Sequence, residues 1–156
     1  MLNFKISETE DYEKLVPFFI ENELEFSEDE PVPTDLVKCW QIVRKDEAGE
    51  EQLIGAFVLA KREDEFIVDG IAIAPEYRKY KLGKTLLDRG LEETLRLGGK
   101  RIFLVARAPG FFRKQGFVTV PREDAPNFFE CLTCPQYGVS CHPEVMRLVL
   151  DVPRNV

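Results

Sequence analysis

A chain of 156 residues can bury one sizeable core, and its 44% hydrophobic content is typical of a globular protein and not of a disordered one. The 28 acidic residues outnumber the 21 basic ones, and the net charge of −7 argues against general nucleic-acid binding, which depends on neutralising phosphates. No apolar run reaches the ~20 residues of a membrane span, and no basic-then-apolar leader opens the chain. We therefore expect one cytoplasmic domain over residues 1–156, with neither nucleic acid nor membrane as partner.

The N-terminal part predicts a strand, a helix and an acidic connection. Residues 2–6 have strand composition, and Ser7 is the expected N-cap of a helix over residues 11–20. The acidic window over residues 21–30 is either a solvated connection or the rim of a site that attracts a cationic amine. The apolar residues that this helix should turn inward are Leu15, Phe18 and Phe19.

A meander of three strands is expected next. A short turn capped by Thr34 and ending near Trp40 precedes it. The strands cover residues 40–45, 52–61 and 65–73, joined by a hairpin at 46–50 and a charged turn at 62–64.

The most informative segment joins the last of these strands to a helix. Ile71-Ala72-Ile73-Ala74 runs into Pro75 and a basic loop with one glycine. A helix begins with about four N–H groups that have no partner inside it, and its dipole adds roughly half a positive charge there. The segment predicts an anion pocket for a pyrophosphate, with a solvated basic helix start as the alternative. The cations of the loop are Arg78, Lys79, Lys81 and Lys84, and the leucines expected to face the sheet are Leu82, Leu86, Leu87, Leu91 and Leu95.

The second half predicts one more helix and three more strands. Gly98-Gly99 ends the long helix, and residues 102–106 form a buried strand. Residues 109–117 form a short helix and turn, and residues 118–120 and 145–150 supply closing strands. This order predicts a mixed sheet with helices on both faces.

Two motifs resemble those of the GNAT acyltransferases. Their acetyl-CoA loop reads Arg or Gln, two residues, Gly, one residue, then Gly or Ala, and residues 78–83 are Arg-Lys-Tyr-Lys-Leu-Gly. Phe111-Phe112, three residues, then Gly116-Phe117 is similar to a second motif of the family, in family order and at family spacing. Lys81 replaces the first glycine of the loop, and its ammonium can reach a phosphate if its φ is negative.

The resemblance implies a fold, a cofactor and a reaction. The fold is α/β (α+β), with a mixed, mostly antiparallel sheet in which two strands splay apart and admit the pantetheine arm of acetyl-CoA. Acetyl would pass directly to an amine while both substrates are bound. The residues expected to bind the coenzyme are Ile71, Ala72, Ile73, Arg78, Lys79, Tyr80, Lys81, Leu82, Gly83, Lys84 and Thr85.

The proton transfers have one candidate base and no assigned acid. Asp69 lies two residues before Ile71 and shares its face if the strand is regular, so we expect it to take the amine's proton directly or through water. A strand bulge would turn it away and leave it a surface acid. Many family members carry a Tyr where this chain has Phe112, which cannot donate a proton; solvent, a thiol or Tyr137 are the alternatives.

The cysteines near the C-terminus admit three interpretations. Cys131-x-x-Cys134 followed by Cys141-His142 is half of a zinc pattern, and Cys39 is a further candidate ligand. Structural thiols and a redox role are the other two. A spaced second cysteine pair is missing, so we assign no metal.

The acceptor is the least determined part. Residues 50–147 resemble the short amino-acid N-acetyltransferases, which include N-acetylglutamate synthases. Asp69 stands where those enzymes tend to carry Arg, Ala106 where Thr is usual, and Pro126 where a Lys is usual. These changes remove cations that would hold an acidic substrate. We expect a small amine or amino acid as acceptor; glutamate is one alternative and a catalytically silent acyl-CoA-binding domain another. The family leaves a homodimer open.

Overall fold

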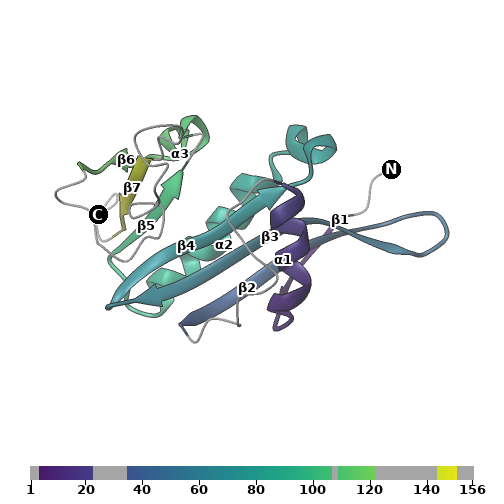
Figure 1. The fold of residues 1–156 in the computed structure, drawn as a ribbon, viewed down its shortest axis with the longest axis horizontal. Coiled ribbons are helices and arrows are strands. Elements are labelled where there is room, and N and C mark those ends of the chain that lie inside the picture. The colour runs from purple at the N-terminus through teal and green to yellow at the C-terminus, as the bar shows by residue number, and fades with distance from the viewer. Residues whose placement is uncertain (1–3, 23–34, 107–108, 122–143, 151–156) are drawn as a thin grey trace.

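The computed structural model describes residues 4–22, 35–106, 109–121 and 144–150, and Figure 1 shows their arrangement. In this part of the chain seven strands form one sheet in the order β1-β2-β3-β4-β5-β7-β6. Strands β4 and β5 run parallel, and the other paired strands are antiparallel. The elements are β1 (Phe4–Thr9), α1 (Tyr12–Glu21), β2 (Leu36–Lys45), β3 (Glu51–Arg62), β4 (Glu65–Ile73), the 3-10 turn η1 (Pro75–Tyr80), α2 (Leu82–Arg96), β5 (Arg101–Ala106), α3 (Gly110–Lys114), β6 (Val118–Thr119) and β7 (Glu144–Val149).

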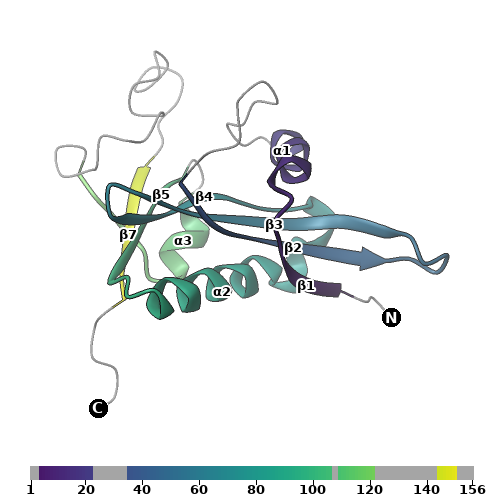
Figure 2. The same ribbon diagram turned by 90° about the horizontal axis from the view of Figure 1, so that it is seen from below.

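Helices cover both faces of the sheet, with α1 on one side and α2 on the other (Figure 2). The core on the α2 side includes Trp40, Phe57, Leu86, Ile102 and Met146. The core on the α1 side includes Leu15, Phe19, Cys39, Val58 and Ala72. The expected mixed sheet with helices on both faces is confirmed. No helix among the described residues is long and apolar enough to cross a membrane.

The meander matches the prediction closely. Strand β4 spans Glu65–Ile73, as expected from its composition. In the predicted hairpin the amide of Asp46 donates to the carbonyl of Glu50 at 2.9 Å, and Gly49 adopts a φ of +85° that a turn here requires.

The start of α1 differs from the prediction. Ser7 lies inside β1, and Asp11 caps the helix by accepting a hydrogen bond from the amide of Lys14 at 3.3 Å. The predicted short turn ending near Trp40 is also wrong over residues 36–40, because β2 already begins at Leu36; its predicted cap, Thr34, lies outside the described residues. Strand pairing with β3 extends over these residues and overrides the turn signal.

One leucine of α2 is misplaced by the prediction. The buried stripe runs at i, i+4 spacing through Leu82, Leu86, Gly90 and Thr94, so Leu95 falls on the flank and is 50% exposed. At Gly90 the helix approaches the sheet so closely that an added Cβ would lie 2.4 Å from the ring of Phe57.

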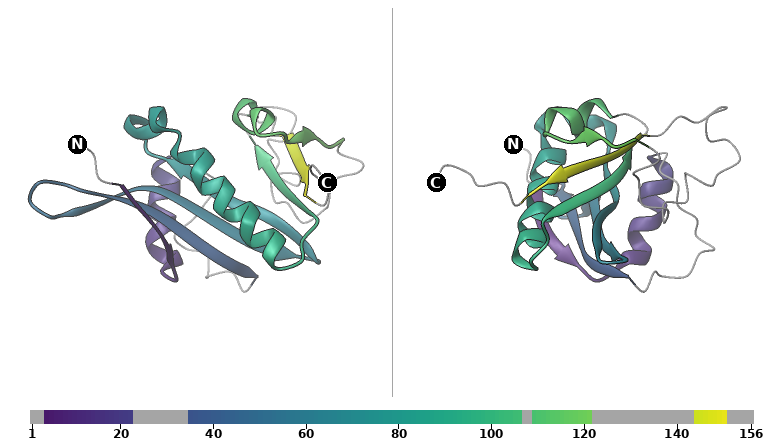
Figure 3. Two further views of the ribbon diagram at one scale, coloured as in Figure 1. Left: turned by 180° about the vertical axis from the view of Figure 1, so that it is seen from behind. Right: turned by 90° about the vertical axis from the view of Figure 1, so that its left-hand side faces the viewer.

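The sheet splits between β4 and β5. These strands pair at Phe66 with Ile102 and at Ile67 with Phe103, and their registered pairing ends there. Beyond this point β5 stays paired with β7 and diverges from β4 (Figure 3, left). The expected splay is therefore present, and it leaves one edge of the second half of β4 open toward β5.

Candidate active site

The first turn of α2 presents backbone amides at the end of β4. The first N–H that finds a carbonyl in the preceding turn is that of Thr85, which donates to Lys81 at 3.4 Å, and its hydroxyl donates to the same oxygen at 3.4 Å. The amides of Leu82, Gly83 and Lys84 precede it and have no intrahelical acceptor. Together with the helix dipole they form a site for an anion.

Lys81 connects η1 to α2 in the left-handed region, with φ 59° and ψ 28°. The expectation of a negative φ is therefore wrong. The chain must turn sharply here because the amide of Lys81 closes the 3-10 turn onto the carbonyl of Arg78 at 3.4 Å while its own carbonyl starts α2. Glycine accepts this conformation without a steric cost, whereas a lysine does not.

Two of the four loop cations are already engaged. Nε of Arg78 donates to the carbonyl oxygen of Ile73 at 3.1 Å and so ties the loop to the end of β4. Nζ of Lys84 pairs with Asp88 one helical turn on, at 2.9 Å. These two side chains shape the loop and its helix.

The other two cations extend into solvent. The Lys79 ammonium lies 5.4 Å from the ring centre of Tyr80, whose side chain is 40% exposed. Lys81 is exposed, and no ion-pair partner for it is found in the described ranges. Lys81 is thus the cation nearest the free amides that keeps its charge available.

The open edge of β4 carries alternate backbone groups. The amide of Ala74 donates to the carbonyl of Ile54 on β3 at 2.8 Å. Because backbone groups of successive residues point to opposite sides, Ala72 also faces β3 whereas Ile71 and Ile73 face the split toward β5. Ile71 and Ile73 therefore have backbone groups that face the split, where an extended ligand could contact them. The backbone groups of Ala72 are used by β3, so its predicted backbone contact with the coenzyme is wrong.

A phenylalanine of α3 lies against the start of α2. An added Cβ on Gly83 would be 3.4 Å from Cζ of Phe111, which is 38% exposed. Phe111 stacks edge-on with Phe112, and Phe112 with Phe117, at ring-centre distances of 5.1 and 5.7 Å. The second motif thus forms an aromatic wall beside the anion site.

Asp69 occupies a β-bulge in β4. The register passes from Gly70 opposite Val58 to Val68 opposite Leu59, which leaves Asp69 as the extra residue. The premise that Asp69 shares the face of Ile71 is therefore wrong. Ile71 packs against the α2-side core. The charge of Asp69 instead acts on Cys39, which belongs to the α1-side core.

Residues 6–117 match the model of the acetyltransferase (GNAT) family. The chain belongs to this family. It is an acetyltransferase that uses acetyl-CoA, as the loop, the splayed strands and the second motif had indicated.

Solved structures share the fold at low sequence identity. An acetyltransferase of the GNAT family from Staphylococcus aureus Mu50 is 18% identical, with a TM-score of 0.69 over 95% of this chain and 99% of that one. The ribosomal-protein-S18-alanine N-acetyltransferase from Escherichia coli is 18% identical, with a TM-score of 0.65 over 99% of both chains. The N-acetylglutamate synthase from Neisseria gonorrhoeae, complexed with coenzyme A and N-acetyl-glutamate, is 14% identical at a TM-score of 0.71; the match covers 97% of this chain and 36% of that one. The comparison with curated proteins gave no match.

The residues of this GNAT enzyme fit the coenzyme. The amides at the start of α2 suit a diphosphate, and the open edge of β4 suits the amide-bearing arm. One carbonyl on that edge is already used, because Ile73 accepts from Arg78, so the N–H groups of Ile71 and Ile73 and the carbonyl of Ile71 are the groups left for a ligand. When bound, the coenzyme supplies an activated thioester.

Arg62 binds Asp69 and also Asp35, and the sequence had singled out neither Arg62 nor Asp35. Nη2 of Arg62 donates to Asp69 at 3.1 Å, and Nε of the same guanidinium donates to Asp35. Burial acts to lower the pKa of Arg62, but the hydrogen bond to Asp35 and the charge of Asp69 outweigh it and raise the pKa above its ordinary value. Burial first and the charge of Asp69 second raise the pKa of the Cys39 thiol to about 11. The enzyme thus places a charged group of one cation and two carboxylates at the bulge.

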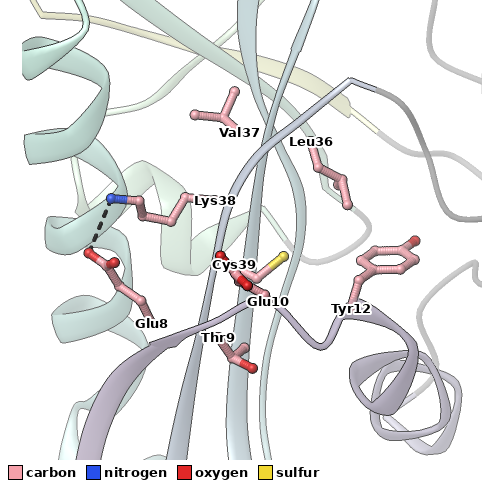
Figure 4. Close-up of a pocket in the computed structure, with 8 residues that line it drawn as sticks. All are labelled: Glu8, Thr9, Glu10, Tyr12, Leu36, Val37, Lys38 and Cys39. Atoms are coloured by element: carbon pink, nitrogen blue, oxygen red, sulfur yellow. Dashed lines mark hydrogen bonds and ion pairs between the residues drawn. The ribbon is translucent and has the colours of Figure 1, made fainter.

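A cavity of about 460 Å³ lies toward the other edge of the sheet, where β1 ends and β2 begins. Figure 4 shows Lys38 on its wall, with Nζ 3.1 Å from a carboxylate oxygen of Glu8. Strand β3 separates β2 from β4 in the sheet, so this cavity is apart from the strand split. Its lining residues are Glu8, Thr9, Glu10, Tyr12, Leu36, Val37, Lys38 and Cys39.

The structure does not test the candidate metal ligands near the C-terminus. Cys131, Cys134, Cys141 and His142 lie outside the described residues, as do Pro126 and Tyr137 and the acidic residues 23–30. Cys39 is a free thiol buried in the α1-side core. Among the residues that the structure describes, no group of three or more His, Cys, Asp or Glu side chains could hold a metal ion.

Proposed function

We propose that this enzyme transfers acetyl from acetyl-CoA to the amine of a small molecule or amino acid by direct attack while both are bound. One observation carries the proposal: the registered pairing of β4 with β5 ends at Ile67 and Phe103, on the same strand that leads through a tight turn into the start of α2. A coenzyme with its diphosphate on α2 and its arm along β4 would bring its thioester to this split.

Backbone groups would bind and polarise the coenzyme. The amides of Leu82, Gly83 and Lys84 would hold the diphosphate, and the ammonium of Lys81 would add a cation beside it. The N–H groups of Ile71 and Ile73 are the donors on the open edge of β4. A donor fixed there would stabilise negative charge that develops on the thioester oxygen, because it needs no reorientation during the reaction.

The acceptor would approach from the α1 face. The α2-side core fills the opposite face, from Leu86 on α2 to Leu104 and Ala106 on β5. Asp69 acts on the α1 face at the bulge, next to the split. An amine with a pKa near ~10 is mostly protonated at pH 7, so a carboxylate that takes its proton, directly or through water, would assist. We therefore propose Asp69 as the base because it lies at the bulge on the α1 face, and no longer because it shares a face with Ile71.

The charge at the bulge favours a cationic acceptor. Asp35 and Asp69 carry two negative charges against the one positive charge of Arg62. Such a group attracts an ammonium and repels the carboxylates of glutamate. The similarity to N-acetylglutamate synthase, at 14% identity, shows the fold alone and does not identify the acceptor.

Thiol release from acetyl-CoA in the presence of single amines tests the proposal. We expect turnover with a cationic amine such as spermidine or cadaverine and little with glutamate. Glutamate as the preferred acceptor would contradict the charge argument, and turnover confined to an alanine-headed peptide would contradict the small-molecule acceptor. Coenzyme A binding by calorimetry without turnover on any amine would instead identify a silent binding domain.

Asp69→Asn tests the base. We expect kcat to fall roughly tenfold or more with the Kd for coenzyme A unchanged, because the substitution removes the proton acceptor and leaves the coenzyme site intact. Equal kcat values and equal pH–rate profiles for the two proteins would exclude the role.

A further inference from the structure

Arg62 is the one cation that joins two carboxylates at the proposed acceptor face, within the part of the chain that the structure describes. Its Nε donates to Oδ2 of Asp35 and its Nη2 donates to Oδ1 of Asp69 at 3.1 Å. The three side chains are 27%, 26% and 20% exposed for Arg62, Asp35 and Asp69, so water screens them only in part. Two like charges therefore share one planar guanidinium in a half-buried position.

The backbone holds this group in place. Arg62 ends β3, and the neighbouring amide of Lys61 donates to the carbonyl of Asp35 at 2.9 Å, which fixes Asp35 beside the strand end. Asp69 is the extra residue of the bulge and precedes the open edge of β4. Arg62 thus links the end of β3 to a carboxylate that lies two residues after Ile67, the last residue of β4 paired with β5.

We propose that Arg62, anchored by Asp35, is a positioning residue that holds the Asp69 carboxylate ionised and aimed at the acceptor amine. The proposal rests on the function proposed above, in which Asp69 takes the amine's proton. It assigns roles to Arg62 and Asp35 that neither the family loop nor the second motif contains.

The charges of Arg62 and Asp35 should affect the protonation of Asp69 in opposite directions, so removing each one tests the proposal. The groups around Asp69 include Arg62 from β3, which binds it, and Asp35 from the turn before β2, which binds the same guanidinium. They also include the buried Cys39 thiol from β2, whose pKa the charge of Asp69 helps to raise. Removing the cation leaves two carboxylates side by side, which favours protonation of Asp69. Removing the Asp35 charge leaves the whole guanidinium to Asp69, which favours its ionised form.

The test is the acid limb of the pH–rate profile with a cationic amine. We expect Arg62→Gln to move the limb to higher pH by about one unit or more, and Asp35→Asn to move it to lower pH. Arg62→Lys keeps a cation but not the planar fork, so its limb should stay near that of the native enzyme while kcat falls. The amine itself titrates identically for every variant, so differences between limbs belong to the enzyme.

The outcomes separate this inference from the proposed function. The positioning role would be overturned if the acid limbs of the pH–rate profiles stay in place. It would also be overturned if they move in the same direction for Arg62→Gln and Asp35→Asn, even if turnover is high. If no amine is turned over, titration of the Asp69 carboxyl by carbon NMR in the same proteins decides the charge argument, and the same opposed shifts are expected. Circular dichroism at each pH and coenzyme A binding test whether each variant is folded. A variant that merely unfolds would change those two signals without shifting the acid limb of its pH–rate profile.

Discussion

Lys81→Gly separates backbone strain from charge at the coenzyme loop. Lys81 adopts φ 59° and ψ 28°, where the Cβ of an L-residue crowds its own backbone at a cost of roughly 1–2 kcal/mol. Glycine removes that cost but gives the unfolded chain more freedom, which offsets about 0.5–1 kcal/mol. The Lys81 side chain is exposed, so little packing is lost. The net gain should be about 0.5–1 kcal/mol, or a rise in Tm of about 1–4 °C for a chain of this size.

The same substitution should weaken coenzyme binding. If the Lys81 ammonium contacts the diphosphate in solvent, its loss should cost about 1 kcal/mol, which is roughly a fivefold rise in Kd. The affinity of the native protein should also fall more steeply with salt than that of the variant. A protein that is more stable and binds less tightly is therefore expected.

Lys81→Ala is the matched control, because it removes the ammonium and keeps the left-handed strain. It should show the same rise in Kd for coenzyme A by calorimetry with no rise in Tm. Equal melting temperatures for the Gly and Ala variants would refute the strain argument. An unchanged Kd in both would refute the contact between Lys81 and the coenzyme.

Three further substitutions or reactions test the packing and the charges. Gly90→Ala should lower the free energy of unfolding, measured in urea, by about 1–3 kcal/mol, because the new Cβ would clash with Cζ of Phe57. This loss is expected even though alanine favours helices. An unchanged urea midpoint would show that the Phe57 ring can move away at little cost. Hydrogen bonds from Arg96 help to lower the pKa of Glu93 from 4.5 to about 2, so its contribution to stability is present above about pH 4.5 and is lost as the pH falls toward 2. In thermal melts over that pH range, Tm should fall less for Glu93→Gln than for the native protein. Parallel curves of Tm against pH for the two proteins would contradict the assignment to Glu93. Cys39 should resist iodoacetamide at pH 8, because burial raises its pKa to about 11, and rapid labelling of the folded protein in peptide mass spectra would count against this.

Local signals predicted most elements because those signals are complete within a few residues. The strand at residues 65–73 and the loop and helix after it follow from composition, a proline and helical spacing. Predictions failed where a distant partner decided the outcome. Asp11 displaced Ser7 as the cap because β1 continues along β2, and Leu95 left the buried face because α2 lies on the sheet along another stripe.

The segment proposed to bind the coenzyme could be chosen from the sequence, but the positions of its side chains could not. The strand–turn–helix placed the free amides correctly. The sequence could not say that Arg78 would bind the carbonyl of Ile73 or that Lys84 would pair with Asp88, because several staggered conformers are open to such long side chains. Only the three-dimensional loop shows that Lys79 and Lys81 extend into solvent and that Lys81 directly precedes the free amides.

The order of elements, the helix start proposed to bind an anion and the aromatic motif were thus determined by the sequence itself, through spacing and backbone chemistry along short stretches. The tertiary structure decided which face Asp69 belongs to, because a one-residue bulge reverses side-chain direction and depends on the register between β3 and β4. It also decided that Arg62 meets Asp35, 27 residues away, as well as Asp69, 7 residues away. Hydrogen-bond register between strands is a non-local property, and it sets the charge at the proposed acceptor face.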